Sequence, residues 1–160
     1  MLTTKKKVYY IILGKSFPRP SENSGKGTEF TKKVTDGVKV QTIRTDYGKW
    51  IKIAEAINKD EAILSIRAWG GRPYNSNQVE VCYCDRIEVL HFRAGVYQNQ
   101  NNKVVFVEGK PITGTELDQF ARDEGFADSY EMFDYLFPPN SKITPTTFEG
   151  ALVKFKSIKQ

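Results

Sequence analysis

The segment GVKVQTIR, residues 37–44, places a lysine, a threonine and an arginine on one short predicted strand. A lysine that is desolvated in a pocket can act as a base, and such a base can activate a threonine hydroxyl as a nucleophile. Lys39 and Thr42 are therefore candidates for a catalytic base and its nucleophile. The same two residues also suit an ordinary strand with a solvated lysine and a β-branched threonine.

The spacing of Lys39 and Thr42 sets a condition on that chemistry. Residues three apart in a regular strand point to opposite faces of the sheet. The two side chains converge only if Lys39 still belongs to the turn that follows Gly37, or if a bulge interrupts the strand. Arg44 shares the strand parity of Thr42, so we expect it to contact the substrate.

A third candidate for chemistry, Glu124, lies far along the chain. It continues the apolar face that Leu117, Phe120 and Ala121 form on a helix predicted over 116–124. A buried carboxylate is costly unless it is paired, and burial raises its pKa toward the range useful for proton transfer. Because Glu124 stands in the last turn, its side chain can also swing out to solvent.

The stretch IRAWGGRPY groups two arginines with two aromatic side chains. Guanidinium groups next to aromatic faces are suited to stacking bases and clamping phosphates. We therefore expect Arg67, Trp69, Arg72 and Tyr74 to bind substrate. A tryptophan at the end of a strand is also a common core residue.

Charge is distributed unevenly along the chain. Residues 1–60 hold 13 basic and 6 acidic side chains, and residues 61–160 hold 11 and 13, within a net charge of +5. A basic half beside an acidic helical segment, 116–134, suits a surface that faces a polyanion. We expect a nucleoside or RNA as the partner, although many domains with a pI near 9 bind no nucleic acid.

Several classes of site and location are disfavoured by composition. Cys82 and Cys84 are the only cysteines, and as residues i and i+2 of a strand they are predicted to stay free thiols. The single histidine, His91, has no cluster of metal ligands near it in sequence, so we expect neither metal nor cofactor. No apolar run is long enough to span a membrane, and the apolar run 8–13 is too short for a signal peptide, so we expect a cytoplasmic protein.

The elements that must position these residues indicate a single α+β domain over 1–160. A long loop is predicted over 16–27, and a short helical turn precedes Gly37. Helices are predicted over 47–58 with Asp46 as N-cap, over 116–124 between Thr115 and Gly125, and from Asp128 or Ser129 to Pro138. Strands are predicted over 7–13, 38–44, 62–69, 78–85, 86–93, a hairpin within 94–109, and 148–158. About six or seven mostly antiparallel strands with about three helices on the rim favour a curled sheet or a small β-barrel.

Two of these segments resemble the motifs of the ASCH domain family, which has a PUA-like small β-barrel fold. GVKVQTIR is similar to its signature G-x-K-x-x-T-x-R, and ARDEGFADSYEMFDYLF is similar to its later helical motif. ILSIRAWGGRPY is similar to the stretch between the two motifs in a longer subgroup. The resemblance covers about residues 28–158, with an additional loop at 16–27 and an additional hairpin near 94–107. It also departs at Gln41, where this subgroup often carries histidine.

The resemblance implies a function and roles for the candidate residues. One branch of the family comprises N(4)-acetylcytidine amidohydrolases, in which a lysine, a threonine and a glutamate are catalytic; here these are Lys39, Thr42 and Glu124. Thr42 would attack the acetyl carbonyl, Lys39 would take the hydroxyl proton, and Glu124 would serve proton transfer to the leaving amine or orient the lysine. Arg44 and backbone amides near Gly37 would stabilise the oxyanion. The alternative is a PUA-like module that binds RNA or a modified nucleotide without turnover.

Overall fold

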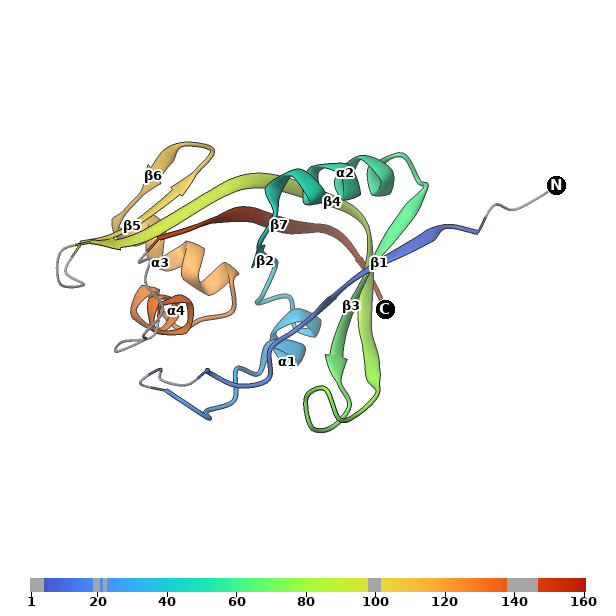
Figure 1. The fold of residues 1–160 in the computed structure, drawn as a ribbon, viewed down its shortest axis with the longest axis horizontal. Helices are drawn as coiled ribbons and strands as arrows, with labels where there is room; N and C mark the ends of the chain where they lie inside the picture. The colour runs from blue at the N-terminus through green and yellow to red at the C-terminus, as the bar shows by residue number, and fades with distance from the viewer. Residues whose placement is uncertain (1–4, 19–20, 22, 98–101, 138–146) are drawn as a thin grey trace.

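The structure is a computed structural model that describes residues 5–18, 21, 23–97, 102–137 and 147–160. Within these ranges the chain forms seven strands and four helices, an α+β arrangement around one sheet (Figure 1). The strands are β1 (Lys7–Ile12), β2 (Gln41–Arg44), β3 (Ala62–Trp69), β4 (Gln78–Tyr97), β5 (Asn102–Val107), β6 (Lys110–Ile112) and β7 (Thr147–Lys159). The helices are α1 (Phe30–Thr35), α2 (Tyr47–Asn58), α3 (Gly114–Asp123) and α4 (Ser129–Leu136).

Two long bent strands, β4 and β7, form the centre of the sheet. They pair antiparallel, and their register shifts on either side of Arg86. Such a bulge bends a strand and increases its twist, which lets one strand continue where two were predicted over 78–85 and 86–93. The prediction of two strands was therefore wrong. On its other edge β4 pairs first with β3 and then with β5, and β6 follows β5 as a short strand that the sequence analysis did not predict.

The two ends of the sheet curl toward each other. β1 pairs parallel with β3, the one parallel ladder among the described strands, and β2 pairs antiparallel with β7. Among the described residues no ladder joins β1 to β2, so the sheet is not closed into a barrel and the predicted small barrel is not confirmed. One side-chain hydrogen bond crosses this open seam, from Nη2 of Arg44 in β2 to the Ile12 carbonyl in β1 (3.1 Å).

Helix α2 covers one side of the long strands, as Figure 1 shows above β4 and β7. The Asp46 carboxylate accepts a hydrogen bond from the Lys49 amide, which confirms the predicted N-cap. The predicted apolar face of the helix is buried, and it consists of Trp50, Ile53, Ala54 and Ile57. At the other end, the Asn58 side chain exchanges two hydrogen bonds with the backbone of Ile87, beside the bulge in β4. The helix is thus fixed to the sheet at both its face and its end.

The other three helices lie on the opposite side of β4 and β7 (Figure 1). Helix α3 begins after Thr113 rather than after the predicted cap Thr115, and Gly125 follows its C-cap with φ +99°. That left-handed conformation favours glycine, as predicted for this position. Helix α4 begins at the predicted cap Asp128, whose carboxylate accepts from the Glu131 amide (2.9 Å). Its predicted stop at Pro138-Pro139 lies outside the described residues, as do Gln98–Asn101 at the tip of the predicted hairpin.

The predicted loop 16–27 is anchored at both its base and its tip. Ser16 and Gly27 form a β-bridge at the base, and the Thr28 hydroxyl donates to the Gly14 carbonyl. At the tip, the Ser21 hydroxyl donates to the Asp134 carboxylate in α4 (2.9 Å). Phe17 of this loop is buried in the core. The loop is therefore packed against α4 and forms part of the structure around the seam.

Cys82 and Cys84 are both buried free thiols, as predicted, and burial raises the pKa of each. Among the residues that the structure describes, no helix combines the length and hydropathy needed to cross a bilayer. Within the same residues, no three side chains of histidine, cysteine, aspartate or glutamate gather where they could hold a metal ion. His91 instead pairs its Nε2 with Glu149 (2.7 Å) and packs against the Tyr47 ring.

Candidate functional site

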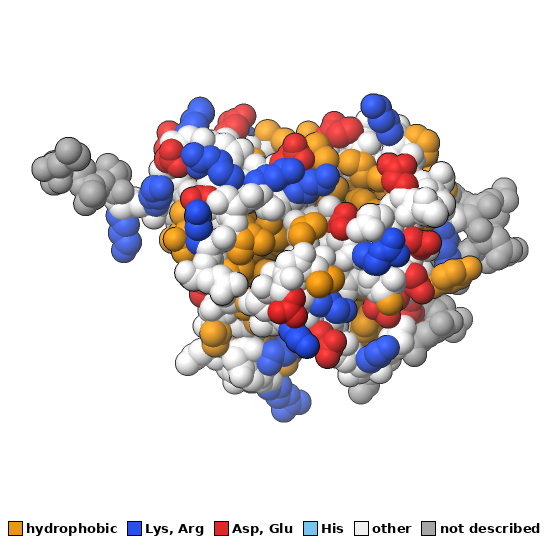
Figure 2. Space-filling view, turned by 180° about the vertical axis from the view of Figure 1, so that it is seen from behind, with side chains coloured by type: hydrophobic (Ala, Val, Ile, Leu, Met, Phe, Trp, Pro, Cys, Tyr) orange, Lys and Arg blue, Asp and Glu red, His pale blue; other side chains and the backbone are white. Residues whose placement is uncertain are grey.

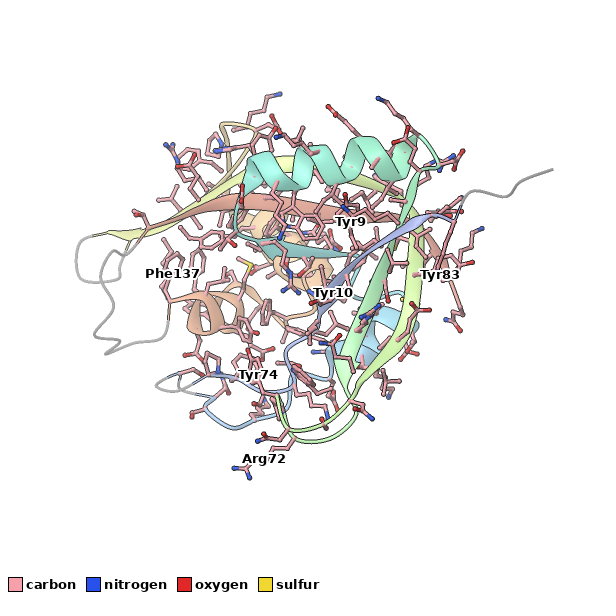
Figure 3. All side chains as sticks on the ribbon, turned by 45° about the vertical axis from the view of Figure 1, so that its right-hand side comes forward. Tyr9, Tyr10, Arg72, Tyr74, Tyr83 and Phe137 are labelled. Atoms are coloured by element: carbon pink, nitrogen blue, oxygen red, sulfur yellow. The ribbon has the colours of Figure 1, made fainter. Side chains whose placement is uncertain are left out.

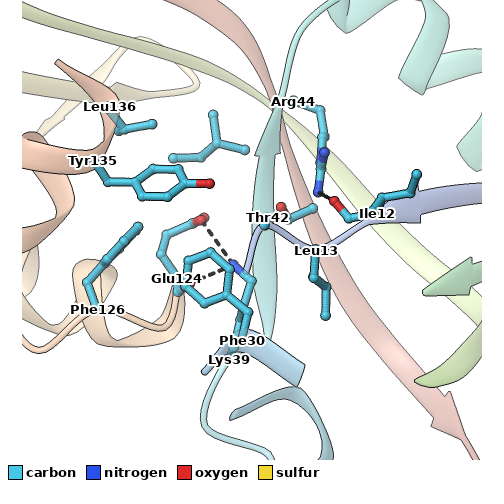
Figure 4. Close-up of a pocket in the computed structure, with 12 residues that line it drawn as sticks. Ile12, Leu13, Phe30, Lys39, Thr42, Arg44, Glu124, Phe126, Tyr135 and Leu136 are labelled. Carbon is cyan, nitrogen blue, oxygen red and sulfur yellow. Dashed lines mark hydrogen bonds and ion pairs between the residues drawn. The ribbon is translucent and has the colours of Figure 1, made fainter. Parts of the chain in front are cut away.

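A cavity of about 290 Å³ lies at the open seam between β1 and β2. Residues 12–14 form one wall and residues 42–44 the opposite wall, and side chains from α1, the end of α3 and α4 complete it (Figure 4). Its volume is at the lower end for ligand pockets, which suits a ligand of the size of a nucleobase. The lining residues are Ile12, Leu13, Gly14, Phe30, Lys39, Thr42, Ile43, Arg44, Glu124, Phe126, Tyr135 and Leu136.

Lys39 enters this cavity because it precedes the strand. β2 begins only at Gln41, three residues later than the predicted strand 38–44. Gly37 has φ +74°, and the amides of Val38 and Lys39 both donate to the Lys33 carbonyl at the end of α1. Lys39 therefore belongs to the turn, and strand parity does not apply to it. This is the first of the two conditions under which Lys39 and Thr42 were expected to converge.

Lys39 and Glu124 form a buried ion pair. The Nζ of Lys39 lies 3.6 Å from Oε2 of Glu124, and both side chains are 3% exposed. The same Nζ donates to the carbonyl oxygens of Gln41 (2.8 Å) and Glu124 (2.5 Å), and it lies 4.5 Å from the centre of the Phe30 ring. These contacts hold the amine at one point on the cavity wall. Glu124 does not swing out to solvent, because the chain turns at Gly125 and returns it to the core.

Burial favours the neutral form of both partners, so it shifts their two pKa values in opposite directions. It lowers the pKa of Lys39 to about 8, since the ammonium loses its hydration, and the Glu124 carboxylate opposes this shift. Burial also raises the pKa of Glu124, opposed chiefly by the charge of Lys39. The pair therefore exchanges a proton more readily near neutral pH than two exposed groups would.

Thr42 lines the cavity from β2 and is 5% exposed. Its backbone is held opposite Val153 in β7. Within the described residues its hydroxyl has no hydrogen-bond partner, and none joins it to Lys39. The hydroxyl is thus free to meet a ligand, while the Lys39 amine donates to the Gln41 and Glu124 carbonyls instead.

Three buried polar atoms around the cavity lack hydrogen-bond partners among the described residues. They are Nε2 of Gln41, Nε of Arg44 and Oε1 of Glu124. The Gln41 amide also lies close enough to lower the pKa of Glu124, although no hydrogen bond of normal geometry joins them. Buried polar groups are rarely left unpaired without a reason. Of these three residues only Arg44 and Glu124 line the cavity, so one donor and one carboxyl oxygen are available to a polar ligand there.

The rest of the wall is apolar and largely aromatic. The rings of Phe30, Phe126 and Tyr135 pack edge to face or tilted, with centroids 5.3–5.8 Å apart. A Cβ on Gly14 would come within 2.6 Å of the Tyr135 hydroxyl, so only glycine permits this approach. These aromatic residues were not among the predicted site residues. The sequence indicated them only through the aromatic content of the motif ARDEGFADSYEMFDYLF, which contains both Phe126 and Tyr135.

The structure brings together Lys39, Thr42, Arg44 and Glu124 of the predicted site. The amides near Gly37, predicted as oxyanion donors, are all used: Gly37 donates to Val34, and the next two to Lys33. That prediction was wrong, because these amides form the hydrogen bonds of the turn that contains Lys39. Arg44, the other predicted donor, keeps an Nε without a hydrogen-bond partner among the described residues.

Only two of the four predicted substrate-binding residues in IRAWGGRPY line a cavity. Trp69 and Tyr74 line a second, outer cavity that adjoins the first. Arg67 and Arg72 line neither cavity. Arg67 donates to the Ser65 hydroxyl and the Gln78 amide oxygen and stacks on Tyr10, while Arg72 points away from the molecule at the tip of the β3–β4 loop (Figure 3).

No protein-family model, no curated protein and no solved structure matches this chain.

Proposed function

We propose that this protein is an amidohydrolase that acts on an acylated nucleobase or nucleoside such as N(4)-acetylcytidine, and that it belongs with the ASCH domains. The observation that carries the proposal is the buried Lys39–Glu124 pair beside the Thr42 hydroxyl on one cavity. These are the three positions that the resemblance assigns to catalysis, and they come from three separate segments. In this proposal the curled sheet is an open form of the PUA-like barrel.

The proposed reaction proceeds through an acyl-threonine. The neutral amine of Lys39 takes the proton of the Thr42 hydroxyl, whose oxygen attacks the acyl carbonyl carbon. Arg44 stabilises the resulting oxyanion. The carbon–nitrogen bond then breaks, and the Glu124 carboxylate passes the proton taken up by Lys39 to the leaving amine. Water then hydrolyses the acyl-threonine: its hydroxyl completes the carboxylic acid and its remaining proton restores the Thr42 hydroxyl, so that Lys39 is neutral again.

The unpaired polar atoms support a base of this kind as ligand. An acylated cytosine presents ring and carbonyl acceptors and one amide N–H. The unpartnered donor on Arg44 suits one of the acceptors, and Oε1 of Glu124 suits the N–H. The aromatic rings around them suit the faces of a flat heterocycle.

A hydrolysis assay with N(4)-acetylcytidine tests the proposal. We expect release of cytidine by wild type and loss of at least about 100-fold in kcat with Thr42→Val, which removes only the hydroxyl. Lys39→Ala should also abolish hydrolysis, although an unpaired buried Glu124 costs about 3–5 kcal/mol of stability. Thr31→Ala and Lys32→Ala, on the exposed part of α1, are matched controls that should keep wild-type rates. Full activity of Thr42→Val would reject the threonine mechanism.

The second candidate function is binding of RNA or a modified nucleotide without turnover. It is favoured by the absence, among the described residues, of a hydrogen bond between Lys39 and Thr42. In contrast, Figure 2 shows basic and acidic side chains interspersed on one face, with no single-sign stripe across it, so this face adds no support for a polyanion as partner. If wild type releases no cytidine but binds the acetylated nucleoside, this second function is the correct one.

A further inference from the structure

The outer cavity at the seam is larger than the candidate active site. Its volume is about 790 Å³, and it shares a wall with the inner cavity: Ile12, Leu13, Gly14 and Arg44 line both. A nucleobase that fills the inner cavity leaves this outer groove unused. The groove is therefore open to a second group while the inner cavity is filled.

Aromatic faces are presented along the outer groove. The rings of Trp69 and Tyr74 lie 5.2 Å apart at its rim, and Tyr74 is 86% exposed. Tyr74 also has φ +64°, an unfavourable conformation for a tyrosine. Tyr10, 52% exposed, lines the groove from β1 (Figure 3). Exposed aromatic rings arranged in this way are platforms on which bases stack.

Three basic side chains line the outer groove. They are Lys15, Arg44 and Lys49, against the single carboxylate of Asp46, which caps α2. Arg44 stands on the shared wall, uses Nη2 for the Ile12 carbonyl, and retains the unpartnered Nε that the proposed reaction directs to the oxyanion. The ammonium groups of Lys15 and Lys49 are therefore the groups suited to a phosphodiester that connects the occupants of the two cavities.

We propose that the outer groove holds the nucleotide next to the acylated base, so that the substrate is a single-stranded oligonucleotide rather than a free nucleoside. This proposal rests on the proposed function for the position of the acylated base. The acylated base occupies the inner cavity, its phosphodiester lies on Lys15 and Lys49, and the adjacent base stacks on Trp69 and Tyr74.

Substrate comparison tests this proposal. The substrates are N(4)-acetylcytidine, its 3′- and 5′-monophosphates, and dinucleotides with adenosine on either side. We expect kcat/KM for one dinucleotide to exceed that for the nucleoside about tenfold or more, since a stacked base contributes about 1–3 kcal/mol. Trp69→Ala and Tyr74→Ala should each reduce that ratio severalfold. Tyr130→Ala, which removes an exposed tyrosine that lines neither cavity, should leave it unchanged.

Two results would overturn the proposal. One is equal kcat/KM for the nucleoside and both dinucleotides. The other is that the monophosphates raise kcat/KM as much as the dinucleotides do, while Trp69→Ala and Tyr74→Ala have no effect. That result would indicate a phosphate site without base stacking.

Calorimetric binding of unmodified cytidine–adenosine dinucleotides separates this proposal from the proposed function. If no acetylated substrate is hydrolysed, but a dinucleotide binds more tightly than cytidine and Tyr74→Ala removes the difference, the groove is confirmed and the hydrolase is rejected. If acetylcytidine is hydrolysed and the dinucleotide gains nothing in rate or binding, the hydrolase is confirmed and the groove is rejected.

Discussion

At the scale of single residues, the site depends on two ionisable groups that share one buried position. Lys39 is fully paired, by two carbonyl oxygens and the Glu124 carboxylate, whereas Oε1 of Glu124 has no partner among the described residues. A buried ion pair of this kind is weak evidence for stability, since desolvation offsets most of its attraction. Its placement on a cavity wall beside an unpaired hydroxyl is better explained by proton transfer.

The pH dependence of hydrolysis follows from the Lys39 amine. Its pKa is lowered to about 8, and only the neutral amine acts as a base. We therefore expect kcat/KM to rise with pH and to level off above an apparent pKa near 8, which a profile from about pH 6 to 10 would show. In Glu124→Gln the carboxylate no longer raises the pKa of Lys39, so the residual activity should level off at lower pH. A flat wild-type profile would contradict the role of Lys39.

At the scale of elements, the site is made by what happens at the ends of helices and strands. The turn after α1 delivers Lys39, the first residues of β2 deliver Thr42, and the C-cap of α3 delivers Glu124. The Val40 amide donates to the Asp123 carbonyl, which fixes the first of these segments to the third. The geometry of the pair is therefore set by the junction of α3 with the turn before β2.

Gly125 is the residue on which this junction depends. An alanine there would face φ +99°, and its Cβ would lie 3.1 Å from the Phe30 ring and 3.2 Å from Cδ of Lys39. We expect Gly125→Ala to lower kcat/KM at least about tenfold and to cost roughly 1–2 kcal/mol of stability from the backbone alone. Denaturant unfolding and the hydrolysis assay measure the two effects.

A matched control for this variant is Gly109→Ala in the β5–β6 turn. Gly109 has φ +76°, but its Cβ would meet nothing within 4 Å. The stability loss should be similar, while kcat/KM should stay at the wild-type value. Equal loss of activity in both variants would mean that Gly125 acts only through global stability.

At the scale of the whole molecule, the open seam of the sheet is the feature that creates a pocket. Bent strands β4 and β7 curl the sheet until β1 and β2 face each other, but no ladder closes the gap. A closed barrel would fill this space with strand pairing. The seam instead leaves an inner cavity, an outer groove and Arg44 between them.

Arg44 should therefore contribute to holding the two edges together. A hydrogen bond to a charged group contributes about 1.5–3 kcal/mol, so Arg44→Met should destabilise the protein by about that amount. Amide hydrogen exchange should become faster in β1 and β2 but not in β5 and β6. The control is Arg93→Met, which removes an exposed arginine stacked on Phe106. It should leave amide hydrogen exchange in β1 and β2 unchanged. Unchanged exchange in β1 would mean that packing alone holds the seam.

Local elements were predictable because their signals are local. The periodic apolar face and the Asp46 cap predicted α2, and the strand predicted over 62–69 is β3 with its observed bounds. The continuity of β4 was not predictable, because the bulge at Arg86 depends on pairing with β7, a strand more than 60 residues later in the chain. The short strand β6 was missed because three residues carry too little pattern.

The sequence by itself determined which residues could do chemistry: a lysine and a threonine after a glycine turn, and a carboxylate on an apolar helix face. It also determined the condition under which the first two converge. Only the tertiary structure decided that the condition is met, that Glu124 is buried against Lys39, and that Arg67 and Arg72 lie away from both cavities. The physical reason is that side-chain burial and pairing depend on contacts between distant segments, such as Lys39 and Glu124, 85 residues apart, which no local pattern encodes.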